Sequence, residues 1–141
     1  MNTTKLQLNT YLSFNGQCEA AFKFYEQTLR GKIENMMTFE SMPAEFPVPD
    51  AWRKKILHVT LRVGSQELMG SDAPPERYQK PAGCFVNIGL TDPAEAERIF
   101  NALAENGTVT MPLQKTFWAV RFGMLVDRFD IPWMINCGQP A

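Results

Sequence analysis

Cysteine is scarce in this chain of 141 residues, and the spacing of its cysteines matches no disulfide or metal-binding pattern. The three cysteines, Cys18, Cys84 and Cys137, are odd in number, widely separated and without CxxC spacing. This pattern argues against a disulfide scaffold and against a structural zinc site. We therefore expect reduced thiols, most of them buried.

An excess of charge of one sign is also lacking. Fourteen Lys and Arg residues face fifteen Asp and Glu residues, which leaves a formal net charge of -1 and no run of like charges. Because nucleic acids and anionic membranes are bound through clustered cations, we expect neither as a partner.

Long apolar runs are missing too, although 45% of the residues are hydrophobic. No run approaches a membrane span, and the N-terminus has no basic flank followed by an apolar segment. The composition suits one domain, or two fused half-domains, with a real core. We expect a cytoplasmic protein.

An internal repeat is the strongest signal that the sequence does contain. One register of the chain against itself aligns Glu19-Ala20, Phe24, Gly31 and Ile33 with Glu95-Ala96, Phe100, Gly107 and Val109. Both halves read as strand, helix, glycine stop and strand, so the sequence predicts a duplicated unit. We expect an α+β fold of tandem βαβββ modules, about 5–73 and 83–138, forming one domain with a cupped mixed sheet and helices on its outer face.

Each half carries the apolar spacing of an amphipathic helix. Asp92, Pro93 and Glu95 predict the start of the second helix through a capping box, and Asn106-Gly107 its stop. Strands are expected over residues 6–14, 32–39, 56–63 and 66–71, then 84–90, 108–113, 119–127 and 132–137. Proline-rich segments at 41–52 and 74–81 predict, respectively, an ordered surface loop and the junction of the halves.

Strand alternation assigns one sheet face to the helices and leaves an unusual second face. The helix-side set is Leu6, Leu8, Leu12 and Phe14, then Leu57, Val59, Leu61 and Val63, then Cys84, Val86, Ile88 and Leu90. Asn9, Tyr11 and Ser13 fall on the other face, together with His58, Thr60 and Arg62, and with Phe85 and Asn87. This mixture favours a concave pocket, although a solvated or dimer-packed face would also fit.

Several blocks of this chain resemble one known family. They are Tyr11 to Gly16, Glu19 to Tyr25, His58 to Leu61 and Leu68 to Asp72, with Thr116 to Ala119, Asp127 to Phe129 and Ile131 to Asn136 as the most specific. The chain resembles the PhnB-like branch of the vicinal oxygen chelate superfamily, which includes glyoxalase I, fosfomycin-resistance proteins and extradiol dioxygenases. Arg30 and Asp130 depart from that branch, because both stand where it usually has glycine.

The resemblance implies four metal-ligand positions, which fall on Asn9, Met69, Phe85 and Met134. Phe85 cannot coordinate a metal, and thioethers are soft donors unsuited to Zn, Mn, Ni or Fe. We therefore expect no metal and no other cofactor, although a divalent metal at a nonstandard site is an alternative. Two methionines could also hold copper(I), yet a methionine on a strand more often serves packing.

Candidate ligand contacts come from the second face and from the aromatic block. His58, the only histidine, could act as a general base or bind a ligand, and Arg62 or Arg121 could receive an anion. Trp118, Phe122 and Trp133 could line a pocket, or pack in an ordinary core or a dimer interface, an alternative that suits Trp133 slightly better. Strand alternation puts Arg121 opposite Trp118 and Phe122, so one of these two sets must face outward. The full candidate set for ligand binding is Asn9, Tyr11, His58, Arg62, Met69, Ser71, Phe85, Trp118, Phe122 and Met134.

Taken together, these features predict a metal-independent small-molecule binding protein, expected to be a homodimer, with the ligand between the half-sheets. The alternative is a lyase, thiol transferase or isomerase in which His58 transfers protons. The branch has carried a ubiquinone methyltransferase label, but the sequence has no glycine-rich strand-to-helix turn for a nucleotide-like cofactor.

Overall fold

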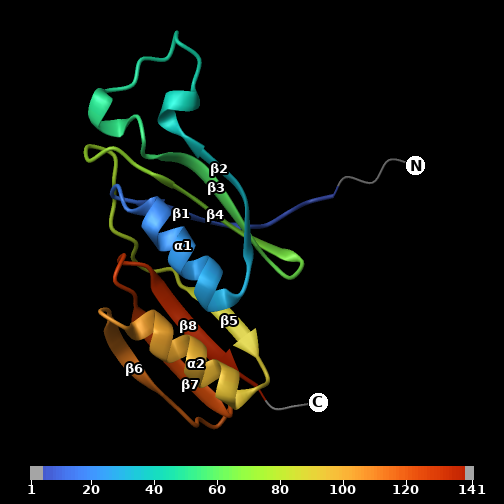
Figure 1. The fold of residues 1–141 in the computed structure, drawn as a ribbon. Helices are drawn as coiled ribbons and strands as arrows, with labels where there is room; N and C mark the ends of the chain where they lie inside the picture. The colour runs from blue at the N-terminus through green and yellow to red at the C-terminus, as the bar shows by residue number, and fades with distance from the viewer. Residues whose placement is uncertain (1–4, 139–141) are drawn as a thin grey trace. The chain divides into compact units, whose positions relative to one another are not determined.

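The computed structural model describes residues 5–138 and divides the chain into two compact units, Met1–Glu76 and Arg77–Ala141. The first unit contains β1 (Thr10–Phe14), α1 (Cys18–Leu29), β2 (Lys32–Thr38), β3 (Ile56–Val63) and β4 (Gln66–Asp72). The second contains β5 (Val86–Leu90), α2 (Pro93–Ala104), β6 (Thr108–Gln114), β7 (Arg121–Val126) and β8 (Pro132–Cys137) (Figure 1). The predicted α+β class and the two βαβββ modules are confirmed.

Both units build the same mixed four-stranded sheet. The strand orders are β1-β4-β3-β2 and β5-β8-β7-β6, with the first and last strands of each unit parallel and the other neighbours antiparallel. Tyr11 lies opposite Met69 in the first sheet, and Asn87 opposite Met134 in the second. Tyr11 and Asn87 are aligned by the repeat, and Met69 and Met134 hold matching positions in the closing strands, so equivalent residues pair in the two halves and the halves share one backbone plan.

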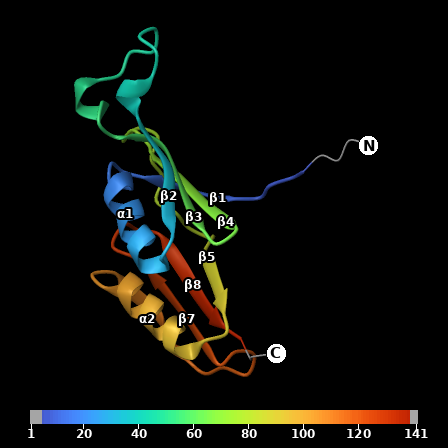
Figure 2. The same ribbon diagram turned by 45° about the vertical axis from the view of Figure 1, so that its right-hand side comes forward.

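The helices bury their predicted faces, each against its own sheet (Figure 2). In the first unit Phe22 and Tyr25 of α1 are fully buried and contact Phe14 of β1, with ring centroids 5.8 and 6.5 Å from it. In the second unit the buried face of α2 is Ala96, Ile99, Phe100 and Leu103. Burying each large apolar side chain contributes about 1.5–3 kcal/mol, so these faces fix the helices to the sheets.

Gly31 and Gly107, paired in the repeat, occupy the same place in the two units. A Cβ on Gly31 would lie 2.6 Å from the carbonyl oxygen of Arg62, and one on Gly107 would meet the carbonyl oxygen of Val126. Each glycine therefore lets its helix exit lie directly against the neighbouring strand.

The N-termini of the two helices are capped differently. Asp92 caps α2 locally, because its Oδ1 accepts a hydrogen bond from the backbone N–H of Ala94 at 3.1 Å. The N-cap residue of α1, Gln17, makes no side-chain cap. Asp72, at the end of β4, accepts from the N–H of Cys18 at 2.9 Å instead, and its other oxygen accepts from the N–H of Ile56 at 2.8 Å.

The glycine departures both lie in left-handed backbone. Arg30 ends α1 at φ 55° and Asp130 has φ 71°. Glycine adopts this region without the steric cost that a Cβ imposes, which explains why the related branch uses it there.

Three predictions about strand ends and faces are wrong. Leu6 and Leu8 are 86% and 93% exposed, because both precede β1, which begins only at Thr10. Cys84 is exposed because β5 begins only at Val86. Ile56 is buried in place of Leu57, since the β2–β3 register shifts between Met37 and Thr38 and reverses the alternation there.

The two proline-rich segments behave as predicted. The first contains short 3-10 helices at Phe39–Ser41 and Asp50–Trp52, and the rings of Phe39 and Trp52 lie 6.0 Å apart. The second spans the boundary between the units. Among residues 5–138, no helix has both the length and the apolar character needed to span a bilayer.

Candidate functional site

The first sheet has a face turned away from α1, and most of the first-unit candidates lie on it. Gly70 marks the helix side, because a Cβ there would lie 2.6 Å from the ring of Phe22. Leu12 and Val59 share a row with Gly70, so the next row along these strands, Tyr11, Met69 and Thr60, belongs to the opposite face. We call this surface the open face of the first sheet; His58, Arg62 and Ser71 lie on it too.

His58 is held at both ring nitrogens. Its Nδ1 lies 3.1 Å from the hydroxyl oxygen of Tyr11, and its Nε2 lies 2.9 Å from the hydroxyl oxygen of Thr60. A neutral imidazole donates from one nitrogen and accepts at the other, and both hydroxyls can take either role. The ring is therefore fixed in orientation while its tautomer can exchange, with Thr60 buried on one side and the half-exposed Tyr11 on the other.

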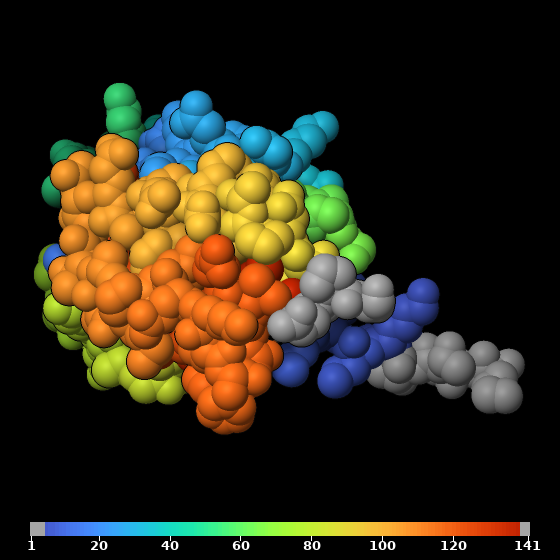
Figure 3. Space-filling view, turned by 90° about the horizontal axis from the view of Figure 1, so that it is seen from below, coloured from blue at the N-terminus to red at the C-terminus, as the bar shows by residue number. Residues whose placement is uncertain are grey.

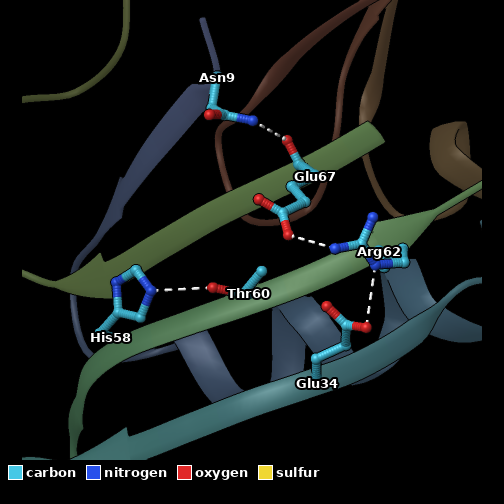
Figure 4. A network of polar contacts seen from close by, with 6 residues as sticks. All are labelled: Asn9, Glu34, His58, Thr60, Arg62 and Glu67. Atoms are coloured by element: carbon cyan, nitrogen blue, oxygen red, sulfur yellow. Dashed lines mark hydrogen bonds and ion pairs between the residues drawn. The ribbon is translucent and has the colours of Figure 1, made fainter. Parts of the chain in front are cut away.

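Arg62 binds two carboxylates, but these belong to the protein itself rather than to a ligand. Its Nε donates to Glu34 at 2.9 Å and a terminal nitrogen donates to Glu67 at 2.6 Å (Figure 4). The hydrogen bond to Glu34, reinforced by the charges of Glu34 and Glu67, raises the pKa of Arg62 above its ordinary value. Two carboxylates around one guanidinium leave an excess negative charge, so this group suits a hydrogen-bond donor or a cation better than the predicted anion.

An open cleft of about 380 Å³ adjoins this ion-pair group. Its lining consists of Gln7, Leu8, Asn9, Thr10, Arg62, Ser65, Gln66 and Glu67. The Asn9 amide donates to the carbonyl oxygen of Glu67 at 3.3 Å, which attaches the chain preceding β1 to β4. Asn9 and Arg62, both predicted contacts, are thus brought to one cleft.

Sequence reasoning missed the two carboxylates. Glu67 could have been found, because the tight turn at Gly64-Ser65 places Arg62 directly opposite Glu67 in the hairpin. Glu34 lies 28 positions from Arg62 on a strand whose register shifts beside it, and the sequence carries no signal for that pairing.

The second-unit candidates include one aromatic pair, Trp118 and Phe122, besides Phe85 and Met134. The ring centroids of Trp118 and Phe122 lie 5.3 Å apart, and Trp118 is 50% exposed. Figure 3 shows the orange part of the chain, to which α2, β6 and the segment that joins β6 to β7 belong, at the molecular surface. Phe85 precedes β5 and is 42% exposed.

Two alternatives left open by the sequence are settled in this unit. Trp133 is fully buried and donates its Nε1–H to Asp127 at 2.8 Å, so it belongs to the core. Arg121 lies toward α2, where its Nε is 3.5 Å from Glu97, which leaves Phe122 on the opposite face.

The donor set at the metal positions does not fit the metals of the superfamily. Asn9 offers one amide oxygen, Met69 and Met134 offer neutral thioethers, and Phe85 offers nothing. Among residues 5–138 there is no group of three or more His, Cys, Asp or Glu side chains placed to hold a metal ion. We therefore derive no step through a metal.

Asp72 and Cys18, on the helix side of the first sheet, have structural roles. Asp72 holds the start of α1 and of β3, as described above. Burial raises the pKa of the Cys18 thiol, and the charges of Asp72 and Glu19 raise it further, so this thiol stays protonated and is a poor nucleophile.

Comparison with known proteins agrees with this geometry. The family model described as 3-demethylubiquinone-9 3-methyltransferase matches residues 6–136. Protein YjdN of Escherichia coli K12 is 33% identical over 142 residues, covering 93% of this chain and 95% of that protein. The crystal structure of PA1353 from Pseudomonas aeruginosa is 48% identical, with a TM-score of 0.88 over 96% of this chain and 100% of that one.

More distant structures share the fold alone. A PhnB protein from Bacillus cereus is 21% identical with a TM-score of 0.79, covering 94% of this chain and 100% of that chain. Glyoxalase and fosfomycin-resistance structures match at lower identity. The chain therefore belongs to the 3-demethylubiquinone-9 3-methyltransferase family and shares its fold with these glyoxalase and fosfomycin-resistance structures.

Proposed function

We propose that this protein binds a small organic molecule on the open face of the first sheet, without a metal at the usual positions of the superfamily. One observation carries the proposal: His58 is fixed between Tyr11 and Thr60 on a sheet face that also carries the Arg62 ion pairs and their cleft. Arg62 and Glu67 line the cleft, and the proposed site extends from there along the sheet face to His58, which is outside the cleft lining. Pre-oriented polar groups are typical of ligand sites.

The charges of this face support a class of ligand. Glu34 and Glu67 outnumber Arg62, and each already forms an ion pair with it. An incoming anion would meet two carboxylates, whereas a cation or a neutral donor would meet unused oxygen lone pairs. The half-exposed ring of Tyr11 adds an aromatic surface that favours a cation or a flat group.

The remaining parts of the proposal rest on the family and the composition. We propose a cytoplasmic homodimer without a resident cofactor, whose partner is a small molecule rather than nucleic acid or membrane. The family description names a methyltransferase, but we do not extend that activity to this chain, because its sequence offers no glycine-rich turn for a nucleotide-like cofactor.

Three matched probes test the proposal: benzylamine, benzyl alcohol and benzoate, which share a ring and differ in charge. Titration at pH 7.5 is followed by the NMR signals of the His58 imidazole. We expect benzylamine to bind about tenfold or more tightly than benzoate, and Tyr11→Phe to weaken its binding. The control variant Tyr78→Phe, in the second unit, should bind like the wild type.

Two results would contradict the proposal. One is tighter binding of benzoate than of benzylamine, which would mean that the carboxylates do not set the ligand class. The other is the absence of any change in the His58 signals with all three probes, which would leave this face as a structural surface.

A further inference from the structure

Three methionines lie side by side across the second sheet. Met111 of β6 is directly opposite Met124 of β7, and Met124 is directly opposite Met134 of β8. Directly opposed residues on neighbouring strands have Cβ atoms about 4.5–5.5 Å apart, and a methionine side chain can span that distance. Three sulfur atoms can therefore meet near the central residue.

The three side chains belong to the face of the sheet away from α2. Leu125, next to Met124, is fully buried, and a Cβ on Gly123 would lie 2.7 Å from the ring of Phe100. Trp133 and Ile135, on either side of Met134, are fully buried as well. Met124 and Met134 are only partly buried and Met111 is 37% exposed, so the row is open to solutes.

The fold itself does not require methionine in this row. The first unit repeats the same backbone, and its corresponding row contains Met69, Thr60 and Asn35. Polar side chains therefore suit two of the three positions, and packing against α2 does not explain the methionines. A row of thioethers on an open face needs another explanation.

We propose that Met111, Met124 and Met134 form a binding site for copper(I). Neutral thioethers are soft donors that select monovalent soft cations over Zn²⁺, Mn²⁺ or Fe²⁺. The site goes beyond the proposed function, because it uses different residues, lies wholly within the second unit and involves binding alone, with no redox step. The amide of Asn87, next in the row on β5, offers a neutral neighbour.

Silver(I) is the redox-inert probe for the first experiment. The Cys84→Ser variant serves as the background, because the exposed Cys84 thiol would compete for a soft cation, whereas Cys18 and Cys137 are buried. Methionine methyl groups labelled with ¹³C report on all eight methionines separately. We expect one equivalent of silver(I) to shift three signals, those of Met111, Met124 and Met134.

Variants then assign the affinity, with copper(I) measured by competition against bicinchoninate. Met124→Leu keeps the volume of the side chain, so the fold should persist, as checked by circular dichroism. We expect it to weaken silver(I) and copper(I) binding about tenfold or more, while the control Met42→Leu, in the loop after β2, leaves both unchanged.

Two outcomes would overturn the assignment. Unchanged affinity in a folded Met124→Leu variant would show that the row is not the site. Silver-induced shifts spread over other methionines, or absent altogether, would leave the row as an adaptable apolar surface for organic ligands.

Discussion

Asp72 is the residue whose substitution tests most sharply how the first unit is built. Its carboxylate is 3% exposed, and its two oxygens accept from two different backbone N–H groups, one at the start of α1 and one at the start of β3. Asp72→Asn keeps the shape but converts one acceptor into an NH₂ group. One backbone N–H would then face another donor inside the protein.

The magnitude follows from the two losses. A hydrogen bond to a charged group is worth about 1.5–3 kcal/mol, and an unpaired buried N–H costs about 1–3 kcal/mol, though the two are not additive. We therefore expect Asp72→Asn to lower the free energy of unfolding by about 2–4 kcal/mol. For a chain of 141 residues this corresponds to a Tm lower by roughly 10 °C.

Asp92→Asn is the matched control. Asp92 caps α2 through one oxygen at an exposed position, and asparagine caps helices as well as aspartate does, so the change should stay within about 0.5 kcal/mol. Urea unfolding followed by circular dichroism measures both variants. Equal stability of the two variants would refute the account in which one buried carboxylate joins helix and sheet.

Three further predictions concern the backbone at Arg30 and Gly31 and the thiol of Cys18. Arg30→Gly should raise the free energy of unfolding, measured in urea, by about 0.5–1 kcal/mol. It relieves left-handed strain of about 1–2 kcal/mol at φ 55°, and the larger conformational entropy of glycine in the unfolded chain offsets part of that gain. A lower free energy of unfolding would contradict this. Gly31→Ala should cost about 1–3 kcal/mol in the same assay, since its Cβ would lie 2.6 Å from a backbone oxygen, whereas Gly138→Ala, with open space, should cost little. Burial raises the pKa of the Cys18 thiol, so unfolding releases its proton above pH about 8.5, and the wild type should lose up to about 1.4 kcal/mol per pH unit more than Cys18→Ala; parallel alkaline profiles would refute this.

The repeat made much of the fold predictable from sequence. Two strands, Ile56–Val63 and Pro132–Cys137, have their predicted bounds, and Tyr11 and Asn87, which the repeat aligns, take the same place in their sheets. The buried faces of the helices were equally predictable, because each follows from the regular apolar spacing within the helix itself, which packs against a single sheet.

The failures occur where a residue depends on a distant partner. Leu6 and Leu8 continue the alternation of β1, but the pairing of β1 with β4 begins only at Thr10 and Leu68, and the residues of β1 do not show where that pairing begins. The role of Asp72 could not be predicted from the sequence for the same reason, since its two donors belong to α1 and β3.

The sheet face that carries the candidate site was predicted, but the charge of the site was not. The sequence placed His58, Thr60 and Arg62 on one face with Tyr11, and the structure joins Tyr11 to His58 and His58 to Thr60 by hydrogen bonds. The charge of the site was not predictable, because Glu34 reaches Arg62 across a strand with an irregular register.

Native mass spectrometry of protein purified without chelators tests the central claim most directly. We expect a small organic molecule bound to the chain, its loss in the Tyr11→Phe variant, and no stoichiometric Zn, Mn, Ni or Fe. A stoichiometric amount of any of these four metals would contradict the proposal of a metal-independent binding protein. It would do so whether a Met69→Leu and Met134→Leu double variant kept the metal or lost it.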